Sequence, residues 1–127
     1  MSAMTMLSVG NKWYSYSGST FGDVSVPATI QLVFIPNTGL KDSLMQVQPF
    51  FGPLISTSNN DGLGITIKLD DVEIFKQQRF QGNIRSNQVE NEIQLFIPRQ
   101  SKVEILSNNT TGNNTQTRGC TVLGYYL

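Results

Sequence analysis

The sequence predicts an all-β protein, a single antiparallel β-sandwich of about eight strands that is jelly-roll-like. Apolar and polar residues alternate with a period of two, and no stretch of a dozen residues carries a helical apolar stripe. Turn-forming residues separate the alternating segments at short intervals. Eight short strands are typical of a jelly roll, whereas an immunoglobulin-like sandwich, the alternative, usually has fewer.

The expected strands cover residues 12–17, 28–35, 44–51, 63–69, 72–80, 92–97, 102–107 and 118–126. One domain spans residues 1–127, and residues 1–11 are expected to form an extended N-terminal arm. Residues 76–91 contain few large apolar side chains. They are either a fraying strand followed by a long loop or a segment that a partner orders.

A tight hairpin is the clearest local signal in the sequence, at residues 65–75. With Asp70 and Asp71 as a two-residue loop, Leu69 pairs with Val72. The next pairs along the hairpin are Lys68 with Glu73 and Ile67 with Ile74. Apolar side chains then meet on one face and opposite charges on the other, which fixes the register.

Two strands are apolar at almost every position, residues 30–35 and 93–97. This pattern is typical of a central strand that is covered on both faces, or of a strand at a subunit contact. In the last strand, Cys120 and Val122 share a face, and Gly124 continues it where another backbone could approach closely.

Charge and composition exclude several kinds of chemistry. Nine basic and nine acidic residues give a net charge of zero, which argues against a nucleic-acid or anionic-membrane partner. The chain has no histidine and one cysteine, which excludes histidine acid–base catalysis, Ser–His–Asp triads and Cys/His zinc sites. We expect no enzymatic activity, catalytic residue, metal or cofactor, because turn formation accounts for the Asp70–Asp71 cluster.

Adjacent aromatic residues are the strongest indication of function. Neighbouring side chains on a strand point to opposite faces, so Trp13 and Tyr14 cannot both enter one core, nor can Phe50 and Phe51. One ring of each pair faces solvent, a second layer or a partner. Together with Tyr16, these four residues are the candidate protein-interface residues.

Uncharged polar residues suggest the same role. Ser, Thr, Asn and Gln make up 44 of 127 residues, so little charge repulsion keeps copies of the chain apart. Close association with other protein is the first interpretation. A carbohydrate-binding, lectin-like module or a receptor-binding fibre head is the alternative, in which the same aromatic rings stack on a glycan.

The C-terminal part of the chain carries a resemblance. A Pro98-Arg99-Gln100-Ser101 turn feeds a strand, an Asn/Thr/Gly loop follows, and the closing strand contains Gly124-Tyr125. With this order of turn, strand, loop and closing strand, residues 97–126 resemble small jelly-roll and β-sandwich virion proteins of bacteriophages. Such proteins decorate or cement a capsid or form fibre heads. The resemblance carries no functional residue.

This resemblance implies a non-enzymatic structural protein located in the virion. Its partners would be other copies of itself, trimers included, and a capsid or other virion protein, through protein–protein contacts alone.

Overall fold

Strands account for most of the described part of the chain. This computed structural model describes residues 7–16, 20–22, 29–51, 54–55, 62–80, 83–84, 88–89, 92–109 and 116–127. Within these ranges there is no helix, and so none able to span a membrane. The strands are β1 (Leu7–Val9), β2 (Lys12–Tyr16), β3 (Thr20–Gly22), β4 (Thr29–Ile35), β5 (Ser43–Phe51), β6 (Leu54–Ile55), β7 (Gly62–Leu69), β8 (Val72–Phe80), β9 (Asn83–Ile84), β10 (Gln88–Val89), β11 (Ile93–Ile97), β12 (Val103–Asn109) and β13 (Gln116–Tyr126).

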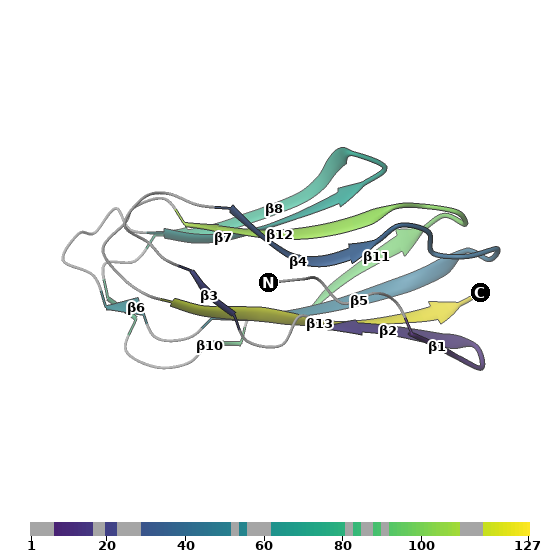
Figure 1. The fold of residues 1–127 in the computed structure, drawn as a ribbon, viewed down its shortest axis with the longest axis horizontal. Coiled ribbons are helices and arrows are strands. Elements are labelled where there is room, and N and C mark those ends of the chain that lie inside the picture. Colours follow the sequence, from purple (N-terminus) through teal and green to yellow (C-terminus); the bar gives the residue numbers. More distant parts are fainter. Residues whose placement is uncertain are drawn as a thin grey trace.

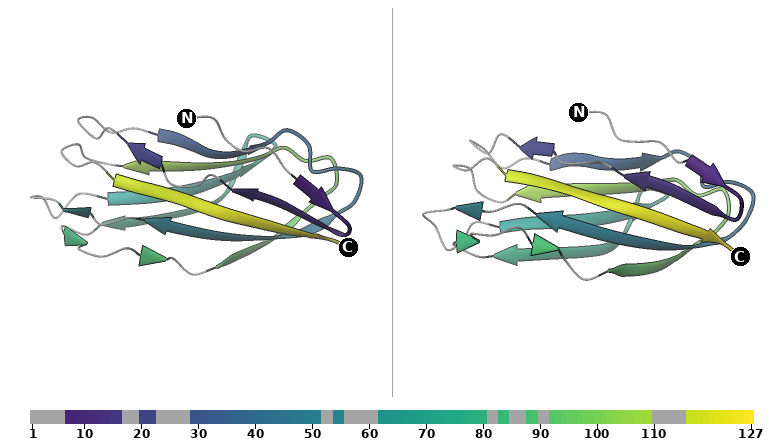
Figure 2. Two further views of the ribbon diagram at one scale, coloured as in Figure 1. Left: turned by 60° about the horizontal axis from the view of Figure 1, so that its bottom comes forward. Right: turned by 90° about the horizontal axis from the view of Figure 1, so that it is seen from below.

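Two antiparallel sheets face each other (Figure 1). Sheet I has the order β1-β2-β13-β5-β10, and in it β11 also pairs with β5 and β3 with β13. Sheet II has the order β4-β12-β7-β8, and β6 and β9 form a separate pair. Seen from below, β13 crosses the front of the molecule between β2 and β5 (Figure 2).

The order of the long strands is that of a jelly roll. Four of them, β2-β13-β5-β11, form one layer, and β4-β12-β7-β8 form the other. Along the chain each long strand passes to the opposite layer, except at the β7–β8 hairpin. This winding of two four-stranded layers confirms the predicted all-β sandwich.

All eight expected strands are present, each within two residues of its expected bounds. The sequence did not indicate the five short strands β1, β3, β6, β9 and β10. The expected N-terminal arm is described from Leu7 onward, and there it is paired: β1 and the turn at Gly10 and Asn11 form a hairpin with β2. In residues 76–91, β8 continues to Phe80 and two short strands follow; the rest lies outside the described residues.

The strands that are apolar on both faces are edge strands, which corrects one expectation. In the described sheets, β4 ends sheet II and β11 pairs only with β5 in sheet I. A central position therefore does not explain their apolar character. The other explanation, a subunit contact, stays open for both.

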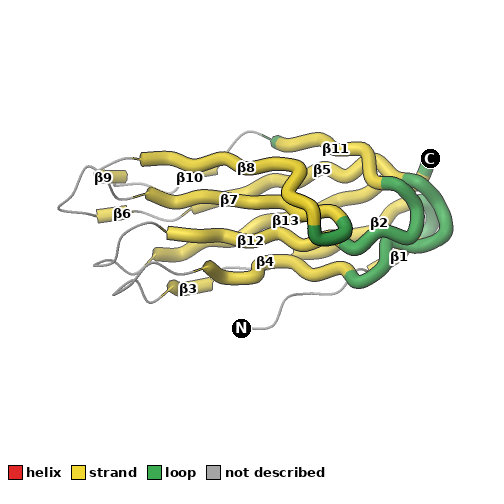
Figure 3. The backbone as a smooth tube through the Cα atoms, turned by 90° about the horizontal axis from the view of Figure 1, so that it is seen from above, coloured by secondary structure: helices red, strands yellow, loops and turns green. Residues whose placement is uncertain are grey.

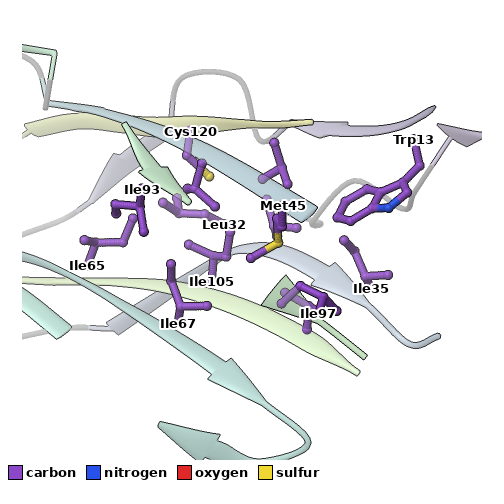
Figure 4. Packing of buried hydrophobic residues seen from close by; sticks show 14 residues of the cluster. Trp13, Leu32, Ile35, Met45, Ile65, Ile67, Ile93, Ile97, Ile105 and Cys120 are labelled. Carbon is purple, nitrogen blue, oxygen red and sulfur yellow. The ribbon is translucent and has the colours of Figure 1, made fainter. Parts of the chain in front are cut away.

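The core lies between the two layers. Alternate residues of each strand point inward, so the apolar residues of the period-two pattern meet there. Figure 4 shows this cluster, with side chains from both sheets interleaved. Its buried members are Trp13, Leu32, Val33, Ile35, Met45, Val47, Ile65, Ile67, Ile93, Ile97, Val103, Ile105, Cys120 and Val122.

A β-bulge corrects the predicted hairpin register. Leu69 pairs with Val72 and Lys68 with Glu73, as predicted, and positive φ angles at both turn residues fit the tight two-residue loop. Ile67, however, pairs with Phe75, because the register shifts by one residue there. Ile74 is the extra residue and is exposed, while Phe75 packs against the core.

Trp13 lies flat against Gly124, its partner residue across the β2–β13 pair. A Cβ atom added at Gly124 would overlap the indole ring. The close approach expected at this glycine is therefore made by a side chain and not by a backbone. The indole fills the end of the core near Ile35 (Figure 4). Within the described residues its Nε1 has no hydrogen-bond partner, so packing alone fixes the ring.

Replacing Gly124 by alanine should destabilise the fold. The new methyl group must displace the indole of Trp13, and overpacking of this kind typically costs about 1–3 kcal/mol. Thermal and urea unfolding of Gly124→Ala should show this loss. Thr121→Ala, at an exposed position of the same strand, is the matched control and should change stability little. Equal stability of Gly124→Ala and the parent would contradict this packing.

Hydrogen bonds join the loops at one end of the sandwich. Figure 3 shows these loops, in green, close together at that end. Thr38 and Ser101 are buried there, and the amide of Thr38 donates to the carbonyl of Ser101 at 2.9 Å. The hydroxyl of Ser101 donates to the carbonyl of Pro98 at 2.7 Å. The amide of Leu127 donates to the carbonyl of Asp42 at 2.9 Å, which fixes the last strand in the same cluster. These buried polar groups are satisfied, as a stable interior requires.

The β7–β8 turn is anchored to Lys102. The amide of Lys102 donates to Oδ1 of Asp70 at 2.8 Å, and the amide of Asp70 donates to the carbonyl of Lys102 at 2.9 Å. The Lys102 ammonium pairs with Asp71 at 2.6 Å. The Asp71 hydrogen bond raises the pKa of Lys102 above its usual 10.5, so this contribution to stability is fully present below 10.5 and is lost as the pH rises through the raised pKa.

Asp70→Gly and Asp70→Asn should separate the two roles of Asp70. Both residues tolerate the positive φ at this position, but only asparagine keeps an oxygen that accepts from the Lys102 amide. We expect Asp70→Gly to lower the free energy of unfolding by about 1 kcal/mol and to speed hydrogen exchange at the Lys102 amide. Asp70→Asn should leave both close to the parent values. Equal exchange in the two variants would show that the side-chain hydrogen bond is unimportant.

Candidate interaction surface

The structure separates the first pair of predicted interface rings. Trp13 is 0% exposed, whereas Tyr14 is 39% exposed and points outward from sheet I. The expectation that one ring of the pair must face outward is therefore met. Trp13 as an interface anchor is a correction: its ring fills the core because Gly124 leaves room for it across the strand pair.

The other candidate residues are described less completely. Phe50 is half-buried on the face of β5 opposite to the buried Pro49, so it belongs to the outer face of sheet I. Tyr16 and Phe51 lie at the ends of β2 and β5, and their side chains are outside the described residues.

The outer face of sheet I carries a mainly apolar surface. The strand registers place eight side chains in two cross-strand rows over β11, β5, β13 and β2. Neighbours within such a row are about 5 Å apart. We call these residues the outer patch. The first row is Phe96, Leu44, Tyr125 and Lys12, and the second is Gln94, Gln46, Leu123 and Tyr14.

Lys12 is the one charged residue of the outer patch. Its ammonium lies 5.4 Å from the centroid of the Tyr125 ring, a cation–π distance. The stem of Lys12 therefore runs along the patch and adds to its apolar area. Glutamine amides supply the other polar groups, and they can be buried against protein at a lower cost than charges.

The outer face of sheet II differs in charge. Half of the corresponding side chains are charged there, and Lys68 lies between Glu73 and Glu104, so opposite charges are neighbours. Its rows are Phe34, Glu104, Lys68, Glu73 and Gln31, Leu106, Thr66, Lys76. A face of alternating charges is typical of a solvent-exposed surface. The outer patch, with several aromatic rings and one charge, has the composition of an interface core. The contrast identifies sheet I as the candidate interaction surface.

Sequence reasoning missed the most exposed ring of the patch. Phe96 is 55% exposed, at the edge of sheet I. Leu127 is 71% exposed, follows Tyr125 by two residues and lies beside the first row. The signal for Phe96 was the apolar strand 93–97, which indicated a subunit contact as one of two explanations.

Metal-ligating side chains are not clustered in the described part of the chain. In the described ranges, no three acidic or cysteine side chains are placed to hold a metal ion. Cys120 is buried in the core, as expected for a small apolar residue.

The described strands form an all-β jelly-roll sandwich with a mainly apolar outer face on sheet I. No family model and no curated protein matches the sequence. The VP2 subviral particle of infectious bursal disease virus is similar, with a TM-score of 0.58 and 12% identity over 91% of this chain and 32% of that chain.

Further structures of the same virus are similar too. Its derived T=1 particles give a TM-score of 0.57 at 12% identity, covering 91% of this chain and 31% of theirs. The structure of the Gx strain gives a TM-score of 0.56 at 11% identity, covering 91% of this chain and 33% of that chain. The chain therefore spans about a third of the length of these viral proteins. The likeness establishes a viral capsid-like β fold.

Trp13→Ala and Tyr14→Ala should have opposite effects although the residues are neighbours. Removing the buried indole should lower the free energy of unfolding by about 3–5 kcal/mol, whereas removing the outward ring of Tyr14 should change it by less than about 1 kcal/mol. Denaturant unfolding followed by circular dichroism measures both. A stable Trp13→Ala variant that has lost self-association would restore Trp13 as an interface anchor.

Proposed function

We propose that this chain is a non-enzymatic structural component of a virion, acting through protein–protein contacts of its outer patch. The single observation behind this is that the jelly-roll sandwich leaves one outer face with two rows of mostly apolar and amide side chains. The fold likeness to particle-forming viral proteins supports it. Decorating or cementing a capsid, of a bacteriophage or another virus, is the finer part of the proposal.

Burial of the outer patch supplies the driving force in this proposal. Exposed apolar surface gains about 25 cal/mol per Å² when it leaves water. Phe96, Tyr14 and Tyr125 are aromatic anchors of the kind that dominate interface energies. A net charge of zero adds no long-range repulsion between copies, so homo-oligomers, trimers included, form without charge compensation.

The residue inventory supports a role without catalysis. The chain has no histidine, and Cys120 is buried. Oδ1 of Asp42 accepts from the Arg99 amide at 2.8 Å. Asp70 and Asp71 hold the β7–β8 turn through the contacts described above. We propose on this basis that it carries out no reaction and needs no cofactor, and that its partners are neither nucleic acid nor membrane.

Light scattering coupled to size exclusion, over a range of concentrations, tests the proposal. The parent chain should form species larger than a monomer, and Tyr14→Lys with Leu123→Lys should weaken assembly about tenfold or more, because it places two charges in the patch. Salt should weaken the contact through the outer patch little, since apolar burial drives that contact. Lys68→Gln with Lys76→Gln, on the outer face of sheet II, is the matched control and should assemble like the parent. A parent chain that stays monomeric at every concentration would contradict the proposal.

A glycan-binding role is the second candidate, because Tyr14, Tyr125 and Phe96 lie among the amides of Gln46 and Gln94. Aromatic rings with adjacent amides suit sugar stacking as well as protein contact. Glycan-array binding by a monomeric parent chain, lost in Tyr14→Ala, would favour this role over assembly.

A further inference from the structure

Among the described strands, the outer edge of β11 is open. β11 pairs with β5 through Ile93–Ile97, and none of the other described strands pairs with its second edge. Figure 3 shows β11 at the margin of the molecule. An open edge presents unpaired backbone N–H and C=O groups, which can pair with another strand.

The other sheet edges carry features that oppose such pairing. β1 has only three residues, and the pairing of β4 with β12 contains a bulge. β8 contains the bulge at Ile74 and the charged residues Glu73 and Lys76. Short length, bulges and charges are the usual protections of an edge strand. β11 has an uninterrupted register over five residues and contains no charge, proline or glycine.

We propose that a second copy of this chain pairs its β11 antiparallel to β11 of the first, joining two copies of sheet I into one continuous sheet. The proposal rests on the proposed assembly function and names the partner and the contact. It also explains why β11 is apolar at nearly every position although it lies at an edge.

A two-fold axis at Leu95 gives the register. All five residues of β11 pair only when Leu95 lies opposite the partner's Leu95, which sets Gln94 opposite the partner's Phe96 and Ile93 opposite the partner's Ile97. Inward apolar residues then neighbour inward apolar residues, as strand alternation requires. A strand that meets its own copy must be free of charge near the axis, because each charge would approach a like charge. β11 meets this condition.

Charges flank the strand in complementary positions. Glu92, exposed just before β11, would lie opposite the partner's Pro98 and next to the partner's Arg99. Arg99 is exposed, and its Nε lies 3.4 Å from Oδ1 of Asp42, so its guanidinium can reach a second carboxylate. The axis creates this Glu92–Arg99 pair twice. A foreign strand would need to reproduce both the apolar centre and the flanking charges, which favours a second copy as the partner.

The pairing also brings two outer patches together. Phe96 begins the first row of the patch at the edge of sheet I, so each patch continues across the axis into the partner's patch. Tyr14 and Leu123 lie farther from the edge and stay available for contacts with a third molecule. The dimer edge and the remaining patch are therefore separate contacts.

Charge variants of β11 test the pairing by light scattering. Gln94→Lys with Phe96→Lys places lysine opposite lysine at both pairs beside the axis and should weaken dimer formation about tenfold or more. Gln94→Lys with Phe96→Glu places opposite charges there and should recover much of the lost affinity. Thr29→Lys with Thr121→Lys adds the same charge at exposed positions away from β11 and should dimerise like the parent. Thermal unfolding of each variant checks that the monomer is intact.

Cysteine pairs test the register itself. Under mild oxidation, a mixture of Gln94→Cys and Phe96→Cys chains should give far more disulfide-linked dimer than either variant alone, since these positions face each other only between copies. The native Cys120 is buried and contributes little background. Equal cross-linking in the mixture and in the single variants would overturn the register.

The outcomes separate this proposal from the proposed function. If the parent chain assembles and the Lys/Lys and Lys/Glu variants of β11 assemble equally well, the edge pairing is overturned, while the proposed assembly function stands. A monomeric parent chain would overturn both. Binding of β11 to an added extended peptide with no parent dimer would assign the edge to a foreign strand, against this proposal.

Discussion

The contact between Trp13 and Gly124 determines how sheet I presents its two faces. A large ring can enter the core from β2 only because β13 has no side chain at the paired position. Once Trp13 points inward, strand alternation turns Tyr14 and Lys12 outward. The same register sets Leu123 and Tyr125 on the outside of β13. The composition of the outer patch thus follows from a packing constraint inside the molecule.

Alternation and turn residues were sufficient to predict the fold class and the eight long strands. They could not predict the bulges. The alternation of apolar and polar residues continues on both sides of a bulge, and only the pairing register shifts there. Leu32 and Val33 are consecutive yet both buried, because the register between β4 and β12 skips one residue there. The predicted register places Ile74 on the core face for the same reason. The three residues of β1 are too few to show a period.

The interaction surface was predictable only in part. Alternation required one outward ring in the pair Trp13–Tyr14, but the choice between them depends on Gly124, which lies at the other end of the sequence. The apolar strand around Phe96 had two explanations, a central or a contact position, and only the sheet order distinguishes them. Sequence patterns describe faces well, whereas neighbours across strands depend on long-range pairing.

The hydrogen bond from the Leu127 amide to the Asp42 carbonyl holds the last residue against β5, beside the first row of the outer patch. Any polypeptide joined after Leu127 must leave the sandwich at that corner. An affinity tag or fluorescent protein fused there would lie close to Tyr125 and would hinder contacts of the outer patch.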